Sequence, residues 1–438
     1  MKCVIIRALE RLRYFSFWSM DYLRGSKIKK SLNNIDYHIE HYHTKKAQVQ
    51  RSINLNNLLN HATQTTDFYK EFGGFKSLTD FPIIDKNSLQ KYPDDFKSNV
   101  FKNKKTKIVS TSGSTGAALF VEHDKGKIIR NTADTIYFSQ KAGFKIGYRL
   151  LYLRHWNPYY KKGKLQTWFQ NILPVEVLNM QDAKLLKLIK YLKTDCSTKG
   201  FIGYASGFEQ LCQFLDEKKM LPLQVNVKSI IAMSEHLNYY TKAKMGYYFS
   251  APVVSRYSNM ENGILAQQNI GESTNFEINW ASYFIEVLDF KNDNHVVAGQ
   301  PGRIVITDLF NYCTPIIRYD TGDIGLLDAT SSPPAFKSIE GRKTDVIYNT
   351  RGEMVSSFIM INANKFHGIK QCQLVQTAIK TYLLKLNTKD TFHEENQVLT
   401  EFKKYLGSDA NLSIQYVDEI PLLASGKRKA TLNKMKSS

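Results

Sequence analysis

The sequence predicts an α/β protein with a large N-terminal domain followed by a small α+β domain. From about residue 104, short apolar segments alternate with helical ones, as in mostly parallel sheets covered by helices. After about residue 276 the segments become short strands separated by Gly, Asn and Asp, which indicates a β-rich subdomain. We expect three parts: a basic helical extension at 1–50, a large domain at 51–340 and a small domain at 341–438.

The N-terminal extension is the most biased part of the chain. Ile5, Leu9 and Leu12 recur at helical spacing, and basic residues lie between and after them. This pattern predicts a basic amphipathic helix. It leaves two interpretations open: the helix docks on the domain with a solvated basic face, or it lies on an anionic membrane surface.

The large domain should begin with strands and helices in alternation. Apolar runs predict strands at 107–111, 119–122, 149–155, 200–204, 229–233 and 253–257. Helical periodicity predicts helices at 125–141, 181–193, 207–218 and 237–248. In the β-rich part we expect strands at 285–289, 303–307, 315–319 and 324–327. The small domain should contain two strands within 372–387, a helix at 391–406 and a strand at 412–417.

Composition excludes several classes of protein. Of the 438 residues, 42% are hydrophobic and 12% aromatic, which suffices for a buried core and excludes disordered and collagen-like chains. The 60 Lys and Arg against 40 Asp and Glu give a net charge of +20, which attracts phosphorylated substrates, nucleic acid or an acidic membrane. No stretch reaches the ~18–20 apolar residues of a membrane helix, so we expect a protein that is neither exported nor membrane-spanning.

The cysteines are odd in number, widely spaced and without a CxxC pair. This pattern predicts neither a disulfide framework nor a zinc ribbon, and it favours a reducing, cytoplasmic location. The five are Cys3, Cys196, Cys212, Cys313 and Cys372.

A loop rich in Ser, Thr and Gly follows the first predicted strand of the large domain. Its glycines let backbone amides converge, and its hydroxyls surround them, which suits phosphate oxygens. No Gly-Lys-Ser/Thr follows, so it is not a Walker A loop. The same pattern alone is also typical of a solvated turn. Its residues are Thr111, Ser112, Gly113, Ser114, Thr115 and Gly116.

Two carboxylates lie in motifs further along the chain. The motif from Tyr257 to Glu261 follows a predicted strand, at the edge where open α/β sheets bind ligands, so Glu261 is a candidate ligand of Mg²⁺. Asp323 lies in an expected tight Gly turn, where a carboxylate can accept both hydroxyls of a ribose. Ordinary strand-end and turn acids look the same, so each motif alone leaves that interpretation open.

Two basic residues complete the list of candidate site residues. Arg342 follows Gly341 at the expected domain boundary and offers a fixed positive charge to ribose or phosphate oxygens. Lys427 lies on a glycine-flanked loop near the C-terminus, where a simple basic tail is the alternative.

In this order the motifs resemble those of the adenylate-forming superfamily of acyl-CoA synthetases and ligases. The similarity is to the branch of phenylacetate–CoA ligase and the CapK-like proteins of surface-polysaccharide clusters. Residues 55–72 and 78–89 look like upstream segments of that branch, as does the stretch from Ser234 and Glu235 to Glu261. The resemblance therefore covers most of the chain.

The resemblance implies ATP between a large domain and a small mobile one. The loop at 111–116 would hold the β- and γ-phosphates, and Glu261 would coordinate Mg²⁺ and act with Lys427 in catalysis. Asp323 would bind the ribose diol, and Tyr257 would belong to the same nucleotide site. Arg342 would contact the ribose or a phosphate, and Lys427 would lie over the acyl carboxylate and the α-phosphate.

The implied reaction is the activation of a small carboxylic acid as acyl-AMP, with release of pyrophosphate. The acceptor would be coenzyme A, or an amine or hydroxyl on a sugar. Thr344 stands where the family commonly has an Asp or Lys at the hinge, and Asp345 follows it. The loop between Ser234 and Tyr257 carries no recognisable coenzyme A signature, so adenylation is better supported than thioester formation.

Other assignments stay open at this point. The acid pocket has four aromatic candidates, which are also typical core residues: Trp156, Tyr204, Phe208 and Tyr257. One alternative function is a nucleotidyltransferase that attaches AMP to an acceptor, similar to coenzyme F390 synthetase. Another is an inactive basic scaffold, although no RNP, KH or zinc-finger signature supports nucleic acid.

Overall fold

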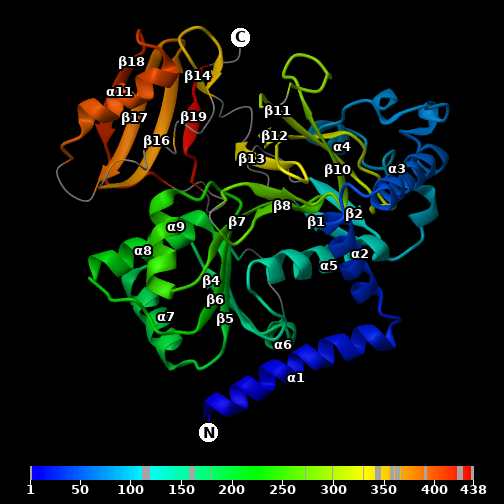
Figure 1. Ribbon diagram of the computed structural model, residues 1–438, viewed down its shortest axis with the longest axis horizontal. Coiled ribbons are helices and arrows are strands. Elements are labelled where there is room, and N and C mark those ends of the chain that lie inside the picture. Colours follow the sequence, from blue (N-terminus) through cyan, green and yellow to red (C-terminus); the bar gives the residue numbers. More distant parts are fainter. Residues whose placement is uncertain are drawn as a thin grey trace. The chain divides into compact units, whose positions relative to one another are not determined.

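The computed structural model describes the backbone of most of the chain. Its described residues are 2–110, 119–156, 163–178, 180–271, 273–297, 299–328, 330–340, 347–355, 360, 366, 368–388, 392–421 and 428–435. The chain divides into two compact units (Figure 1). Unit 1 comprises residues 1–7, 148–255 and 340–438, and unit 2 comprises residues 8–147 and 256–339.

Unit 1 contains a parallel sheet flanked by helices. Strand β3 pairs in parallel with β4 and β5, and β5 pairs in parallel with β6. The elements are β3 (Arg149–Arg154), α6 (Lys164–Phe169), β4 (Ile172–Glu176), α7 (Asp182–Thr194), β5 (Lys199–Tyr204), α8 (Ala205–Glu217), β6 (Val227–Met233) and α9 (Tyr239–Phe249). Strand β7 (Val253–Asn259) contains the point at which the chain leaves unit 1 for unit 2.

Helix α8 packs closely on the parallel sheet because glycines make room for it. A Cβ atom on Gly203 would lie 2.6 Å from the Cβ of Leu153, and one on Gly207 would lie 2.8 Å from a methyl of Val177. Phe208 and Leu211 of α8 are fully buried in this core. Larger residues at the two glycines would force helix and sheet apart.

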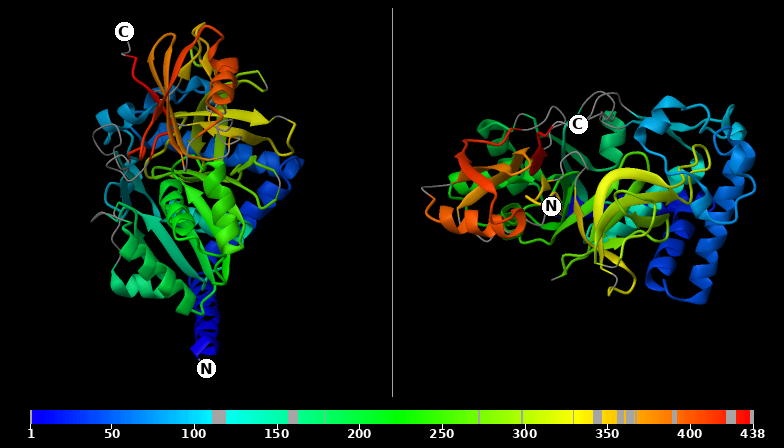
Figure 2. Two further views of the ribbon diagram at one scale, coloured as in Figure 1. Left: turned by 90° about the vertical axis from the view of Figure 1, so that its left-hand side faces the viewer. Right: turned by 90° about the horizontal axis from the view of Figure 1, so that it is seen from above.

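The C-terminal part of unit 1 is a second, smaller sheet with one helix. The strands lie in the order β18-β17-β16-β19, and α11 covers one face (Figures 1 and 2). Val398, Phe402 and Leu406 recur every fourth residue of α11, so they form one buried helix face. The elements are β14 (Ile347–Tyr348), β15 (Met354–Val355), β16 (Ile369–Ala378), β17 (Thr381–Thr388), α11 (Glu395–Leu406), β18 (Asn411–Tyr416) and β19 (Thr431–Asn433).

Unit 2 combines helices with a mostly antiparallel sheet. Its helices are α2 (Lys27–Glu40), α3 (Lys45–Thr65), α4 (Lys86–Lys91) and α5 (Lys125–Lys141), with 3₁₀ turns at Lys70–Phe72, Leu78–Asp80 and Asn99–Phe101. Helix α1 (Lys2–Leu23) begins in unit 1 and belongs to unit 2 from Ala8 onwards. Strands β1 (Lys107–Ser110) and β2 (Phe120–His123) form a separate antiparallel pair. The others lie in the order β10-β11-β12-β13-β9-β8. They are β8 (Gly263–Gln268), β9 (Phe276–Ile278), β10 (Tyr283–Leu288), β11 (Pro301–Asp308), β12 (Tyr319–Asp328) and β13 (Ala335–Glu340).

The predicted α/β architecture with a β-rich part and a C-terminal α+β part is confirmed. The helix predicted at 125–141 has the same bounds as α5. The strand predicted at 315–319 is wrong, because one long strand, β12, begins at Tyr319 and includes the predicted strand at 324–327. Strand β4 was not predicted, since its short segment with Pro174 shows no clear alternation. The three-part division at residues 50 and 340 stays a prediction.

The cysteine prediction needs a correction. Cys3 and Cys196 form a disulfide within unit 1, across a sequence separation of 193 residues. Spacing along the chain could not reveal this pair, because it depends on where the first turn of α1 lies in the fold. Among the described helices, none is both long and apolar enough to cross a bilayer.

Candidate functional site

The motif from Tyr257 to Glu261 forms the connection between β7 and β8. The two strands pair antiparallel, and Asn259 lies opposite Gly263. The side chain of Asn259 accepts a hydrogen bond from the backbone of Asn262 at 2.9 Å, which tightens the turn. Tyr257 therefore lies within β7, and Glu261 lies at the tip of the turn with 8% of its surface exposed.

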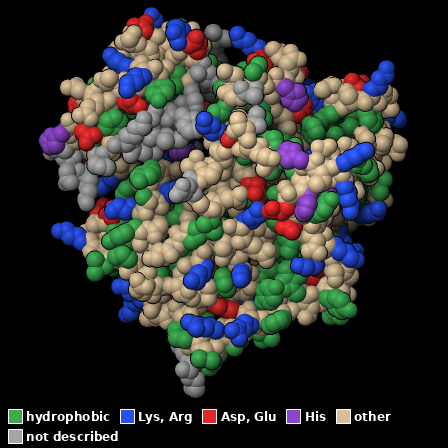
Figure 3. Space-filling model, viewed as in Figure 1, with side chains coloured by type: hydrophobic (Ala, Val, Ile, Leu, Met, Phe, Trp, Pro, Cys, Tyr) green, Lys and Arg blue, Asp and Glu red, His purple; other side chains and the backbone are tan. Residues whose placement is uncertain are grey.

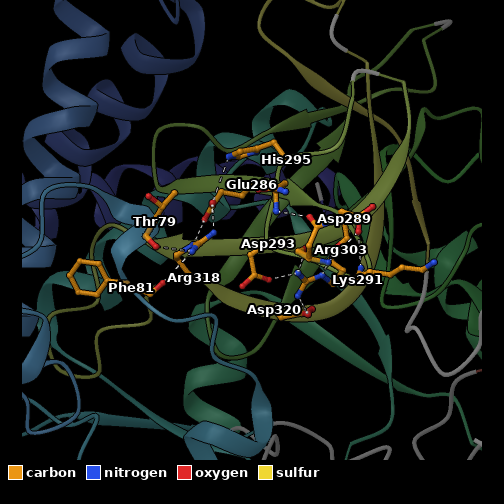
Figure 4. A network of polar contacts seen from close by, with 12 residues as sticks. Thr79, Phe81, Glu286, Asp289, Lys291, Asp293, His295, Arg303, Arg318 and Asp320 are labelled. Atoms are coloured by element: carbon orange, nitrogen blue, oxygen red, sulfur yellow. Dashed lines mark hydrogen bonds and ion pairs between the residues drawn. The ribbon is translucent and has the colours of Figure 1, made fainter. Parts of the chain in front are cut away.

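The second motif, at the start of β12, alternates between two environments. Arg318 makes a paired interaction with Glu286, at 3.2 Å from Nε and 3.1 Å from Nη2, and Asp320 pairs with Arg303 at 3.2 Å (Figure 4). Figure 4 also shows Arg318 donating to the backbone oxygen of Phe81, at 3.1 Å. These ion pairs hold two alternate residues of the motif, Arg318 and Asp320.

The residues between them form a second set of contacts. Tyr319 donates a 3.0 Å hydrogen bond to Oε1 of Glu261. The hydroxyl of Tyr257 lies 2.7 Å from Oδ2 of Asp323 and 3.3 Å from the hydroxyl of Thr321. Side chains at alternate positions of a strand share one face, which explains why these three residues of β12 act together. The structure thus brings together the predicted site residues Tyr257, Glu261 and Asp323.

The two phenols of the site are permanent hydrogen-bond donors. Burial, and then the charge of Asp323, raise the pKa of Tyr257 well above its usual range. Burial, and then Glu261, also raise the pKa of Tyr319. Both hydroxyls keep their protons at neutral pH, so each can donate to a carboxylate and fix its orientation.

A buried histidine supports the turn from the opposite side. Nε2 of His123, at the end of β2, lies 2.8 Å from the backbone oxygen of Glu261. Burial, and then the nearby Lys127, lower the pKa of His123 to about 4. A neutral imidazole therefore donates to this carbonyl, and the backbone of Glu261 is held by β2 as well as by its own turn.

The expected tight turn at Asp323 is wrong, because this residue lies inside β12. The pairing of β12 with β11 shifts register between Arg303 and Val305, so the strand bulges where Gly322 adopts a φ of +77°. The backbone of Asp323 donates to the Thr321 hydroxyl at 3.1 Å within the bulge. The bulge leaves the carboxylate of Asp323 in contact with Tyr257. Asp323 therefore still belongs to the candidate site, although it lies in a strand and not in a turn.

Several predicted site residues lie outside the described part of the chain. They are the loop residues Thr111, Ser112, Gly113, Ser114, Thr115 and Gly116, the boundary residues Gly341, Arg342, Thr344 and Asp345, and Lys427. Their assignments remain predictions.

Unit 1 contains a charged cluster directly after Lys427. We call Arg428, Glu209, Glu235 and Glu419 the Arg428 cluster. Nη1 of Arg428 pairs with Glu209 at 2.5 Å, and Nη2 pairs with Glu419 at 2.7 Å. The backbone of Arg428 donates to Oε1 of Glu235, whose Oε2 accepts from the backbone of Ser206 at 2.8 Å, in the first turn of α8. The cluster therefore joins the C-terminal segment to α8.

Part of this cluster is shielded from solvent: the side chains of Arg428 and Glu209 are buried, whereas that of Glu419 is 59% exposed. Burial raises the pKa of Glu209 to about 7, and the charge of Arg428 opposes that shift. Beside the cluster is a cavity of about 70 Å³, lined among others by Ser206, His236 and Tyr240. A carboxylate, a cation and a small cavity thus meet next to the position expected to carry the catalytic lysine.

The aromatic candidates for an acid pocket have separate surroundings. Phe208 and Tyr204 belong to the hydrophobic core of unit 1. The backbone of Trp156 donates to Oε2 of Glu176 at 3.0 Å, and its ring packs against Tyr152. Tyr257 lies in the site of unit 2 described above.

The chain is similar in sequence and in fold to known proteins. Residues 347–434 match the model of the CapK C-terminal domain family. Protein CapK of Staphylococcus aureus is 22% identical over 401 residues, which cover 86% of this chain and 87% of that protein. The crystal structure of 2-hydroxyisobutyryl-CoA ligase in the postadenylation state has a TM-score of 0.69 at 18% identity, with 88% of each chain covered. The fold is that of the adenylate-forming ligases.

A second solved structure with this ligase fold is ATP-bound MatB from Rhodopseudomonas palustris. Its TM-score is 0.53 at 16% identity, with 73% of this chain and 66% of that chain covered. The anthranilate CoA ligase AuaEII in complex with anthranoyl-AMP gives the same TM-score, 0.53. The ligase fold is thus shared with proteins whose structures hold ATP or an acyl-AMP.

Sequence reasoning missed several residues around the motifs of this ligase fold. Tyr319 and Thr321 could have been found, because their alternation with Arg318 and Asp320 is visible once the motif is read as a strand. His123 and Arg428 carried no signal of this kind. Their roles depend on contacts across 138 and 219 residues of sequence.

Proposed function

We propose that this protein is an ATP-dependent ligase that activates a small carboxylic acid as acyl-AMP. A carboxylate oxygen of the acid attacks the α-phosphorus, the bond from that phosphorus to the bridging oxygen breaks, and pyrophosphate leaves with the electron pair. The observation that carries the proposal is the hydrogen-bonded set of Tyr257 with Asp323 and Tyr319 with Glu261, within a fold of adenylate-forming ligases.

Asp323 and Tyr257 would bind the ribose of ATP. A carboxylate can accept hydrogen bonds from both ribose hydroxyls, as it does in dinucleotide sites. The Tyr257 hydroxyl orients Oδ2 of Asp323 at 2.7 Å before the nucleotide arrives. Preorganisation of this kind lowers the free energy cost of binding.

Glu261 would hold a magnesium ion. Carboxylate oxygens are the hard ligands that Mg²⁺ prefers, and the ion usually needs only one or two of them besides phosphate oxygens and water. When bound, Mg²⁺ would neutralise phosphate charge, while Tyr319 keeps the carboxylate of Glu261 oriented.

The remaining roles rest on the resemblance of the motifs. The loop at 111–116 would hold the β- and γ-phosphates, and Arg342 would contact ribose or phosphate oxygens. Lys427 would stabilise the charge that builds on the α-phosphate during the attack; loss of such a donor typically costs about 10²–10³ in rate.

The acceptor is proposed by analogy with the relatives. The name of the 2-hydroxyisobutyryl-CoA ligase includes coenzyme A, and an open conformation of that protein was crystallised with it. We propose coenzyme A, or an amine or hydroxyl on a sugar, as the acceptor here. From the resemblance of the motifs to the CapK-like branch, we propose a role in surface or capsular polysaccharide biosynthesis in the cytoplasm, where ATP is available.

The decisive experiment measures pyrophosphate release from ATP and Mg²⁺ with a panel of aromatic, aliphatic and hydroxy acids. We expect release with one class of acid, and a loss of about 10²-fold or more in Glu261→Gln, Asp323→Asn and Lys427→Ala. Asp293→Asn is the matched control, because this carboxylate is mostly exposed and pairs only on the Arg303 side of the sheet. Undiminished release in Glu261→Gln and Asp323→Asn would refute the site, and a stable AMP adduct of an acceptor would instead favour a nucleotidyltransferase.

A further inference from the structure

The N-terminal helix α1 presents its apolar side to solvent. We call Val4, Ile5, Leu9, Leu12, Phe15 and Leu23 the α1 stripe. At 100° per residue they fall within about 140° of the helix circumference. Their exposed fractions are 70%, 52%, 37%, 60%, 63% and 82%. The rest of the helix contributes Phe17 and Trp18, which are partly buried against the core of unit 2, so the stripe is a second apolar side that α1 leaves exposed.

Polar residues hold α1 in this orientation. Glu10 and Asp21, on the side away from the stripe, are 7% and 5% exposed. The carboxylate of Asp21 accepts hydrogen bonds from the backbone of Ile28 and of Lys29, both at 2.9 Å, and so caps the start of α2. The disulfide of Cys3 fixes the first turn of α1. The helix cannot roll its stripe inward without breaking these contacts.

Exposed charge around the stripe has one sign. Arg7 and Arg11 lie along one border of the stripe and are exposed. Beyond α1 the exposed residues Arg24, Lys27, Lys29 and Lys30 continue the basic surface. Within residues 2–30 the two acids are the buried Glu10 and Asp21. Figure 3 shows hydrophobic and basic side chains side by side along its lower edge, where Figure 1 draws α1.

We propose that α1 binds the surface of an anionic membrane, lying parallel to it. The stripe would enter the boundary between headgroups and acyl chains, and the flanking arginines and lysines would contact anionic headgroups. A second copy of the chain fits less well. Pairing through the stripe would bring Arg7 and Arg11 of two molecules together, and residues 2–30 expose no carboxylate to compensate them. This inference is independent of the proposed chemistry.

Vesicle co-sedimentation of the full-length protein tests the proposal. We expect binding to vesicles of equal parts phosphatidylglycerol and phosphatidylcholine, weakened by 0.5 M salt, and little binding to phosphatidylcholine alone. The stripe variant Leu12→Glu/Phe15→Glu and the charge variant Arg7→Glu/Arg11→Glu should each lose about 10-fold or more in affinity. Leu221→Glu is the matched control, because Leu221 is 78% exposed and lies far from α1 in sequence.

Further measurements on the same variants distinguish membrane binding from misfolding and from dimerisation. All these side chains are exposed, so circular dichroism and pyrophosphate release in solution should match the wild type in every variant. Equal binding by the wild type and both variants, or equal binding to neutral vesicles, would overturn the proposal. It would also be overturned if light scattering showed a dimer that the stripe variant abolishes, while no vesicle binding occurred.

Discussion

The hydroxyl of Tyr257 donates a 2.7 Å hydrogen bond to Oδ2 of Asp323, across 66 residues of sequence. Four residues beyond Tyr257, Glu261 receives a hydrogen bond from Tyr319, which lies four residues before Asp323. Two short motifs are therefore tied together at both ends. The proposed ribose acid, Asp323, and the proposed metal acid, Glu261, are therefore held by the same two motifs. A substitution that breaks one of the two hydrogen bonds should also weaken the other.

Tyr257→Phe removes the donor to Asp323 and retains the ring. We expect the KM for ATP to rise about 10-fold, because the half-buried carboxylate of Asp323 loses the hydrogen bond that orients it, at a cost of ~1–3 kcal/mol. The value of kcat should change less, since the hydroxyl orients a binding group. Initial rates against ATP concentration give the two constants. Tyr239→Phe, at a tyrosine that is 64% exposed, should behave like the wild type.

Arg318→Ala breaks the buried pair with Glu286, whose side chains are 4% and 1% exposed. We expect a loss of about 3–5 kcal/mol in the free energy of unfolding, because the buried Glu286 keeps only the distant, exposed His295, at 3.8 Å, as a partner. Urea titration measures the change. Arg351→Ala removes the exposed pair with Glu353 and should cost less than ~1 kcal/mol. A similar cost for the two variants would contradict the structural role of Arg318.

His123 should make the fold sensitive to acid. Its pKa is lowered to about 4 in the folded state, against 6.5 without burial, so the unfolded chain binds a proton that the folded chain does not. The corresponding stability is present above pH 6.5 and is lost as the pH falls towards 4, at most about 3 kcal/mol. His123→Gln should flatten the curve of unfolding free energy against pH. His38, with a pKa also lowered to about 4, should supply a similar share that the variant retains.

Arg428→Ala tests the Arg428 cluster. The variant removes the cation beside the buried Glu209, so the cluster should open and Lys427 should lose its fixed neighbour. We expect kcat for pyrophosphate release to fall about 10–100-fold with ATP binding retained, since the proposed ribose and metal acids are unchanged. Arg428→Lys should recover part of the rate. Lys380→Ala, at an exposed pair with Asp409, is the control; a loss of ATP binding in Arg428→Ala would count against a positioning role.

Local patterns predicted much of this fold, and contacts between distant residues account for the rest. Helix α5 has its predicted bounds because its residues recur at helical spacing, and in the structure Asp124 caps its start. Strand β12 was divided in the prediction because Gly322 signals a turn, whereas pairing with β11 turns it into a bulge. Periodicity predicted α1, whereas the contacts of Asp21 and Cys3 and the packing of Phe17 and Trp18 decide which side faces water.

The candidate site was predictable in its residue types and less so in its supports. Tyr257, Glu261 and Asp323 were recognised from their motifs, and the structure brings them together. Their relation through Tyr319 depends on the register of β12, which a single sequence does not specify. His123 reaches the site from a strand more than a hundred residues away, so no local pattern could indicate it.

The alternation of side chains between the two faces of β12 also limits which insertions and deletions the protein tolerates. Substitutions act on one side chain at a time, but a deletion or insertion of one codon between Tyr319 and Asp323 would turn every later side chain of the strand to the opposite face. Asp323 would then leave the face that it shares with Tyr319, and the proposed ribose acid would be lost without a single change of residue type. Length variation among natural homologues should therefore avoid this segment and accumulate in the neighbouring loops.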